Sequence, residues 1–333
     1  MNSIVSLMWW GLAWTILGSV IFALTRGVNR QIQNAAVRHL AWVAAFGCIW
    51  LFPAYAAVSV VIEKAGDTPC AAVPAGLPTA PMIVACVVLM VWVGGAVFTV
   101  GRAILARRAV NRWRAQSIDY RAQLNDRYGS KLPAVLPGNI EIRLARGSDP
   151  AVPITWGVRR PVVLLPSSAE NWETSRLTAV LLHEIGHIRR WDNLTQIFAL
   201  LTCAVHWFNP FFWQAAKKLE AESEIAADDS AILRGVKPSD YAAELLSLAS
   251  QLSAGGPNCI FGQTAMIKPF SLEDRLLTIV NPKARRGPIR LMSMIPVAAI
   301  VFSVIVTITV LTPRLSASLH PKPAAPSCLP PTS

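Results

Sequence analysis

Four apolar stretches without a formal charge limit what this chain can fold into. They cover residues 4–25, 40–62, 81–101 and 291–312. Each is about as long as the ~20 residues that an α-helix needs to cross the hydrocarbon core of a bilayer. Spanning segments of this kind are helical because a backbone in lipid must satisfy its own hydrogen bonds. We therefore predict a mainly α-helical, polytopic membrane protein with four transmembrane helices.

The distribution of charge sets the expected orientation of these helices. The chain is 53% hydrophobic and only 15% charged, with 31 basic and 19 acidic residues. Basic residues gather at 26–38, 102–114 and 283–290, beside the ends of the apolar stretches. Cytoplasmic loops carry such an excess of Lys and Arg. We therefore expect the first loop and the large middle region to face the cytoplasm, with both termini outside. Basic residues placed in this way indicate contact with the lipid bilayer rather than direct binding of nucleic acid.

An HExxH motif lies in the middle of the chain, with His183, Glu184 and His187 as its defining residues. Apolar residues at helical spacing around it predict an α-helix, which Thr174 or Ser175 can cap. Residues i and i+4 share one face of a helix, so the two imidazoles can bind one zinc ion. Glu184 is then placed to act as the general base. The alternative is an ordinary buried helix that happens to carry two histidines.

A second motif supplies a candidate third ligand. Residues 224–228 read Glu-Ile-Ala-Ala-Asp and lie in a predicted helix that begins near Asn209 and ends near Gly235. Glu224 and Asp228 project from one face of that helix. A catalytic zinc site has three protein ligands and an open position, so we predict Glu224 as the third ligand of a single Zn²⁺. Asp228 is expected to hold a zinc-binding histidine by its far ring nitrogen. The alternative for such acidic residues is a solvated helix face.

Four segments together resemble a known family. They are WGVRRPVVLLP at 156–166, HEIGHIRRWD at 183–192, HWFNP at 206–210 and EIAAD at 224–228. With these segments the chain resembles the integral-membrane zinc peptidases of the BlaR/MecR type, which include the β-lactam sensor-transducers. The resemblance implies that His183, His187 and Glu224 hold zinc and that Glu184 is the general base.

The resemblance also implies a function, partners and a location. We expect a multi-pass protein of the bacterial plasma membrane that hydrolyses peptide bonds in a cytoplasmic or membrane-proximal protein, such as a transcriptional repressor in signal transduction. A homodimer is a further expectation. Residues 313–333 form a short Pro-rich tail where the β-lactam sensors carry a penicillin-binding domain, and no Ser-x-x-Lys motif occurs. We therefore do not expect this chain to bind β-lactams covalently.

Two other classes of function stay open. One is a housekeeping metallopeptidase for quality control of membrane proteins, which also pairs HExxH with a later ExxxD. The HWFNP and WGVRRPVVLLP segments favour the transducer family over it. The other is a non-catalytic membrane signalling scaffold, against which the intact HExxH motif and Glu224 argue.

Residues 194–213 are also uncharged, yet they are not expected to form a single crossing. Ligands at 183, 187 and 224 must meet within a few ångströms, whereas a crossing between them would separate them by about 30 Å. We predict a membrane-docked or re-entrant segment that bends back at 207–210. The active site is then expected at the cytoplasmic boundary of the membrane.

These arguments divide the chain into parts. We expect three transmembrane helices with short loops in residues 1–105, a cytoplasmic-side zinc peptidase domain with a small β-sheet in 106–287, a fourth transmembrane helix in 288–312 and an extracytoplasmic tail in 313–333. Residues 103–135 are expected to continue the third span as a basic helix up to a turn at 128–130. Alternation predicts a strand at 140–144. The short runs 152–156 and 161–165, on either side of a turn at Gly157, predict a hairpin. The resemblance implies that an edge strand near the zinc helix holds the substrate by main-chain hydrogen bonds, and the sequence does not identify which strand does so.

Two features of the loops give weaker hypotheses. The segment 251–269 is rich in small residues, as exposed cleavage sites are, so self-cleavage there is one hypothesis and a plain linker is the other. Cys70 and Cys328 both fall on the expected outer side, where a disulfide between them is chemically possible.

Peptide hydrolysis passes through a tetrahedral oxyanion, and the sequence does not identify the hydrogen-bond donor that stabilises it. His206 and Tyr241 qualify by residue type alone, and His206 is the better candidate for a buried structural histidine. Asp192 is expected to cap the following helix rather than to belong to the site.

Overall fold

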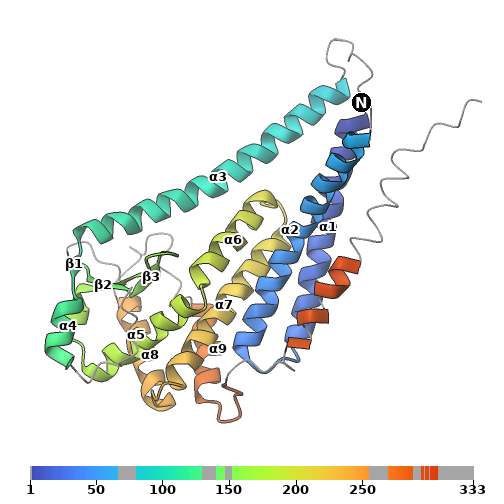
Figure 1. Cartoon of the computed structure of the whole chain (residues 1–333). Coiled ribbons are helices and arrows are strands. Elements are labelled where there is room, and N and C mark those ends of the chain that lie inside the picture. Colours follow the sequence, from blue (N-terminus) through green and yellow to red (C-terminus); the bar gives the residue numbers. More distant parts are fainter. Residues whose placement is uncertain are drawn as a thin grey trace, which may run out of the picture.

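The computed structural model describes residues 2–66, 80–129, 140–146, 152–254, 269–287, 294–295, 297–299 and 301–306. Helices make up most of the described chain, and a small sheet lies at one end of them (Figure 1). The expected tail and the Cys70–Cys328 pair lie outside the described residues, as does most of the hypothetical cleavage segment. The expected fourth span is described only in part.

Three helices are long and apolar. They are α1 (Asn2–Asn29), α2 (Ala35–Gly66) and α3 (Ala80–Gln116). By length and composition, Trp10–Asn29, Ala35–Tyr55 and Cys86–Gln116 could each cross a membrane. Among the described residues, Val297–Val306 forms a shorter apolar helix in the expected fourth span. The described chain thus contains three candidate spans.

Helices α1 and α2 lie side by side and pack against α7 (Pro210–Ile232) (Figure 1). Their shared core is rich in aromatic rings, with Phe22 tilted against Phe46 and edge-on to Phe212. A Cβ atom at Gly18 would lie 2.6 Å from the Phe212 ring, so only glycine permits this approach of α1 to α7. The segment that carries Glu224 is therefore anchored directly to the first two apolar helices.

Helix α3 diverges from α1 and α2 and runs towards the sheet (Figure 1). It contacts the rest of the chain mainly through α6 (Asp192–Val205). Trp92 donates a hydrogen bond to the Val205 carbonyl at 2.9 Å, and Trp207 donates to the Trp92 carbonyl at 3.1 Å. Gly95 admits the Trp207 ring, since a Cβ there would lie 2.1 Å from it. Most other apolar side chains on α3 are exposed, as expected for a helix that faces lipid.

The sheet has four short strands. They are β1 (Ile118–Asp119), β2 (Glu141–Leu144), β3 (Ile154–Trp156) and β4 (Val162–Leu165). The strand order is β1-β2-β4-β3, in which β2 and β4 are parallel and the other pairs are antiparallel. The predicted hairpin is present as β3 and β4, around Gly157 with φ +97°. Strand β3 is consequently an edge of the sheet.

The prediction of one basic helix over residues 103–135 is wrong for the second half of that range. Helix α3 ends at Gln116, and after β1 a separate helix α4 (Arg121–Tyr128) follows. The break occurs because Tyr120 and Leu124 are buried in the core beneath the sheet, where a straight helix could not place them. The Tyr120 amide instead donates to the Ile142 carbonyl of β2 at 3.0 Å.

The HExxH motif lies in α5 (Thr174–Arg189), which packs between the sheet and α7. The expected cap is wrong: Thr174 and Ser175 are inside the helix, and the N-cap residue is Glu173, without a side-chain cap bond. A 3-10 turn (Ser167–Asn171) precedes α5. Trp191 adopts a left-handed conformation with φ 60°, which turns the chain from α5 into α6.

Residues 194–213 do not form one continuous helix. Helix α6 ends at Val205 and α7 begins at Pro210, and the two helices pack against each other. The Asn209 side chain accepts a hydrogen bond from the Phe211 amide at 2.9 Å and so caps α7. The chain therefore turns back between His187 and Glu224. Two further helices, α8 (Pro238–Ala254) and α9 (Pro269–Val280), cover the other side of α5 and α7.

Candidate metal centre

A close contact between α5 and α7 places the two motifs opposite each other. A Cβ atom at Gly186 would lie 3.3 Å from the Cα of Ala227 and 3.3 Å from the Ser230 side chain. The absence of a side chain at Gly186 therefore lets the helices approach closely at the level of the HExxH motif. Glu224 lies one turn before this contact and faces the two histidines.

The three expected ligands converge. One ligand atom each from His183, His187 and Glu224 lies within 4.8 Å of the others. The two histidine Nε2 atoms are 3.1 Å apart, His183 Nε2 is 3.5 Å from Glu224 Oε2, and His187 Nε2 is 3.5 Å from Glu224 Oε1. All three residues come from the helices α5 and α7, so the packing of two rigid elements sets the geometry.

Each histidine is held by a carboxylate on its far side. His183 Nδ1 lies 2.9 Å from Asp228 Oδ1, and His187 Nδ1 lies 2.7 Å from Asp192 Oδ2. A carboxylate accepts a hydrogen bond from Nδ1–H, which leaves the Nε2 lone pair of a neutral imidazole facing the site. The Asp228 carboxylate thus lies beside the far ring nitrogen of His183. The expectation for Asp192 is wrong, because its carboxylate faces His187 instead of capping α6.

The donor set fits a zinc ion. Two Nε2 lone pairs that face each other at 3.1 Å repel unless a cation or a proton lies between them. Two ligands of a tetrahedral zinc ion with bonds of ~2.0–2.1 Å are about 3.4 Å apart, close to the three separations found here. The Oε2 atom of Glu224 is buried and accepts no well-aligned hydrogen bond from the described residues. It is thus available as a ligand.

Arg275 completes the buried charge around the site, and the sequence analysis missed it. Its side chain comes from α9 and is 1% exposed. Nε and Nη2 donate to the two oxygens of Asp228 at 2.8 and 2.7 Å, and Nη1 lies 3.1 Å from Glu224 Oε2. No local pattern could have indicated it, since Arg275 lies 47 residues after Asp228 in the chain.

These charges shift the ionisation of the metal-free site. Burial opposes a charge on His183, but hydrogen bonds and charge interactions with Asp228 and Glu224 outweigh it and raise the pKa of His183 to about 9. Burial likewise opposes charge on Asp228, yet Arg275 and His183 hold the pKa of that carboxyl well below its usual range. The site therefore keeps its carboxylates ionised and needs a compensating cation, which is a proton on His183 or a metal ion.

Glu184 lines a groove beside the histidines. Thr155 of β3 donates a short hydrogen bond from its Oγ1 to Glu184 Oε2. The groove has a volume of about 460 Å³ and runs between α3, β3 and α6. Glu184, His187 and Glu224 line it together with apolar side chains, which include Trp113, Trp156, Ile197 and Leu201. The site is therefore open towards a groove whose walls are mainly apolar.

The two residues considered for oxyanion stabilisation lie elsewhere. Tyr241 donates to Asp228 Oδ1 at 2.7 Å and lies 2.9 Å from His183 Nδ1, behind the imidazole. His206 stacks on Phe212 with centroids 4.0 Å apart, within the aromatic core. Neither residue lines the groove. Tyr241 thus holds the buried carboxylate, and His206 is a buried packing residue.

Two comparisons with known proteins show what this chain is similar to. The Regulatory protein BlaR1 of Bacillus licheniformis is 41% identical to this chain over 76 residues, which cover 23% of this chain and 13% of that relative. The model of the BlaR1 peptidase M56 family matches residues 5–279. This range includes nearly all of α1, α2, α3, the sheet and both motifs. The resemblance stated from the sequence motifs is confirmed. This chain belongs to the BlaR1 peptidase M56 family.

Proposed function

We propose that this chain is a membrane-bound zinc endopeptidase in which His183, His187 and Glu224 bind one zinc ion and Glu184 is the general base. The observation that carries the proposal is the convergence of two imidazoles and a carboxylate from α5 and α7 within 4.8 Å, beside a groove. Membership of a peptidase family supports the same activity.

The chain's own residues divide the work of peptide hydrolysis. A zinc ion in this site would polarise the scissile carbonyl and lower the pKa of a water molecule that it binds. Glu184 takes a proton from the attacking water and passes it to the leaving amine. Thr155 holds the Glu184 carboxylate by a hydrogen bond from the neighbouring strand. Asp228 and Asp192 orient the two histidines.

The substrate is proposed to bind along β3. Among the described residues this strand pairs only with β4, which leaves its outer edge for pairing with an extended peptide. Thr155 and Trp156 of β3 line the groove, as do apolar residues of α3 and α6. Main-chain pairing would place the scissile bond next to Glu184, and the apolar walls would select for apolar side chains around it.

The proposed biological role is regulatory proteolysis at the inner face of a bacterial plasma membrane. The relative from Bacillus licheniformis is named a regulatory protein, which supports a protein substrate with a regulatory role, such as a cytoplasmic transcriptional repressor. We include in this proposal four spans, both termini outside, and a cytoplasmic peptidase domain over residues 106–287. The basic residues that flank the apolar helices support this orientation.

The proposal is tested by comparing new protein N-termini in cells that carry the wild-type chain or Glu184→Gln. The substitution keeps the size of the side chain but removes the base. A small set of N-termini from regulatory proteins should occur only with the wild-type chain. Cleavage of many damaged membrane proteins would instead favour a quality-control peptidase. Identical sets of N-termini would contradict an enzymatic role.

A further inference from the structure

A second pocket, which shares no lining residue with the metal centre, lies between α1, α2 and α7. It has a volume of about 190 Å³. Basic and aromatic side chains dominate its wall; they are Phe22, Arg26, Arg30, Trp42, Phe211 and Lys218. None of the ten described residues that line this pocket is acidic. The pocket therefore suits an anion that also has an apolar part.

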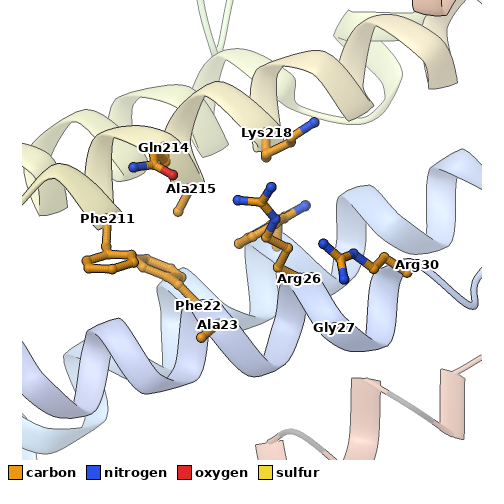
Figure 2. Close-up of a pocket in the computed structure, with 10 residues that line it drawn as sticks. Phe22, Ala23, Arg26, Gly27, Arg30, Phe211, Gln214, Ala215 and Lys218 are labelled. Atoms are coloured by element: carbon orange, nitrogen blue, oxygen red, sulfur yellow. The ribbon is translucent and has the colours of Figure 1, made fainter.

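The two kinds of side chain lie at opposite ends of the pocket (Figure 2). Phe22 and Phe211 lie at one end, whereas Arg26 and Arg30 of α1 and Lys218 of the facing helix α7 gather at the other. The basic end coincides with the end of the candidate span Trp10–Asn29, and Phe22 lies within that span. A membrane lipid has the same polarity, with its headgroup at the interface and its chains deeper.

The charges at the basic end are available to a ligand. Among the described residues, no ion pair or hydrogen bond links Arg26 or Arg30 to another side chain. Lys218 interacts electrostatically with Glu222, which lies one turn further along α7. Glu222 itself pairs with Arg38 at 2.7 Å, outside the pocket. Three cations around a small cavity without a carboxylate form a site for a phosphate group.

An apolar stripe leads from this pocket along α1. Leu12, Ile16 and Val20 are each about half exposed, and their spacing places them on one face of the helix. The same face continues through Ala23 and Gly27 into the pocket wall. Exposed apolar side chains on a helix of this length are covered by lipid chains in a bilayer. Headgroup and acyl chains of one molecule could thus be bound together.

We propose that this pocket binds the headgroup phosphate of an anionic phospholipid, with its acyl chains along the exposed stripe of α1. Arg26, Arg30 and Lys218 bind the phosphate, and Phe22 and Phe211 contact the start of the chains. The lipid joins α1 to α7, the helix that also carries Glu224.

The test uses the full-length chain in neutral detergent, titrated with dioleoylphosphatidylglycerol or dioleoylphosphatidylcholine and followed by native mass spectrometry. The wild-type chain should retain phosphatidylglycerol at least tenfold more tightly. Each basic residue near an anionic headgroup contributes about 1 kcal/mol, so the double variant Arg26→Gln/Lys218→Gln should bind it roughly thirtyfold more weakly. The matched control Arg108→Gln/Arg285→Gln removes the same charge from exposed positions outside the pocket and should bind as the wild type does.

A second readout does not depend on the variants. Phosphatidylglycerol with a photoreactive acyl chain should label peptides from α1 and from the start of α7 in the wild-type chain. No preference for phosphatidylglycerol, an equal loss in the control variant, or labelling confined to other helices would overturn the proposal. So would displacement of the lipid by millimolar inorganic phosphate, because the pocket would then be a site for free phosphate.

Discussion

Arg275 of α9 and Asp228 of α7 form a two-point ion pair in the interior, with Nε–Oδ2 at 2.8 Å and Nη2–Oδ1 at 2.7 Å. Both residues are almost fully buried. The same guanidinium lies 3.1 Å from Glu224. Helix α9 therefore fixes the charge balance of a site whose proposed ligands all come from α5 and α7.

Replacement of Arg275 should weaken both the fold and the metal site. Arg275→Gln leaves two buried carboxylates without their cation, and removal of one partner of such a pair costs about 3–5 kcal/mol. We expect a lower thermal midpoint and weaker zinc binding, measured on the purified chain in detergent. Arg285→Gln removes the same charge from an exposed position and should change neither quantity. Wild-type zinc affinity in Arg275→Gln would show that the ion pair does not support the site.

Asp192 should position His187 without binding the metal. Its Oδ2 lies 2.7 Å from His187 Nδ1, and loss of such a partner lowers metal affinity by about 10–100-fold. Asp192→Asn should therefore bind zinc more weakly by that factor, as measured by competition with a zinc chelator. Asp126→Asn, at an exposed position of α4, serves as the control. An affinity equal to that of the control would leave Asp192 with a purely structural role.

Thr155 should affect the rate of peptide hydrolysis and leave zinc binding intact. Its hydroxyl donates to Glu184 Oε2, and a hydrogen bond to a charged group contributes about 1.5–3 kcal/mol. Thr155→Val keeps the shape of the side chain and should lower kcat about tenfold to a hundredfold once a substrate is in hand. Thr155→Ser restores the hydroxyl and should restore most of kcat. A zinc content that falls together with kcat would contradict this role.

Removal of the metal should destabilise the chain more at alkaline than at neutral pH. The folded-state pKa of His183 in the metal-free site is raised to about 9 from 6.5. A group with a raised pKa stabilises the fold fully below its unfolded pKa, and this contribution is lost as the pH rises through the folded value. The thermal midpoint of the chelated chain should therefore decrease as the pH is raised from 6.5 to 9. The thermal midpoint of the zinc-loaded chain should not show this decrease.

His183→Ala provides the control for that experiment. Its midpoint should not show the additional fall with pH, because the titrating imidazole is gone. A chelator effect of equal size at both ends of the pH range would mean that no proton on His183 replaces the metal.

The sequence predicts the parts of the site that follow helical spacing. His183 and His187 are one turn apart, and so are Glu224 and Asp228, so a single helical turn determines which side chains face the same way. The turn back of the chain before Asn209 follows from the requirement that these helices meet. The hairpin of β3 and β4 follows from two short strand-like runs and the Gly157 turn between them.

The remaining features depend on tertiary packing. Asp192 directly follows the HExxH helix, but only the left-handed turn at Trp191 directs its carboxylate back to His187. Arg275 reaches Asp228 from a separate helix. The parallel pairing of β2 with β4 joins strands about twenty residues apart, which alternation cannot indicate. The end of α3 at Gln116 depends on the burial of Tyr120 beneath the sheet.

Zinc content of the purified full-length chain tests the central claim most directly. The wild-type chain and Glu184→Gln should each contain about one zinc ion per chain, because a general base is not a ligand. His183→Ala and Glu224→Gln should lose nearly all of it. If Glu224→Gln retained the zinc content of the wild type, the carboxylate of α7 would not be a ligand, and the proposed metal centre would be contradicted.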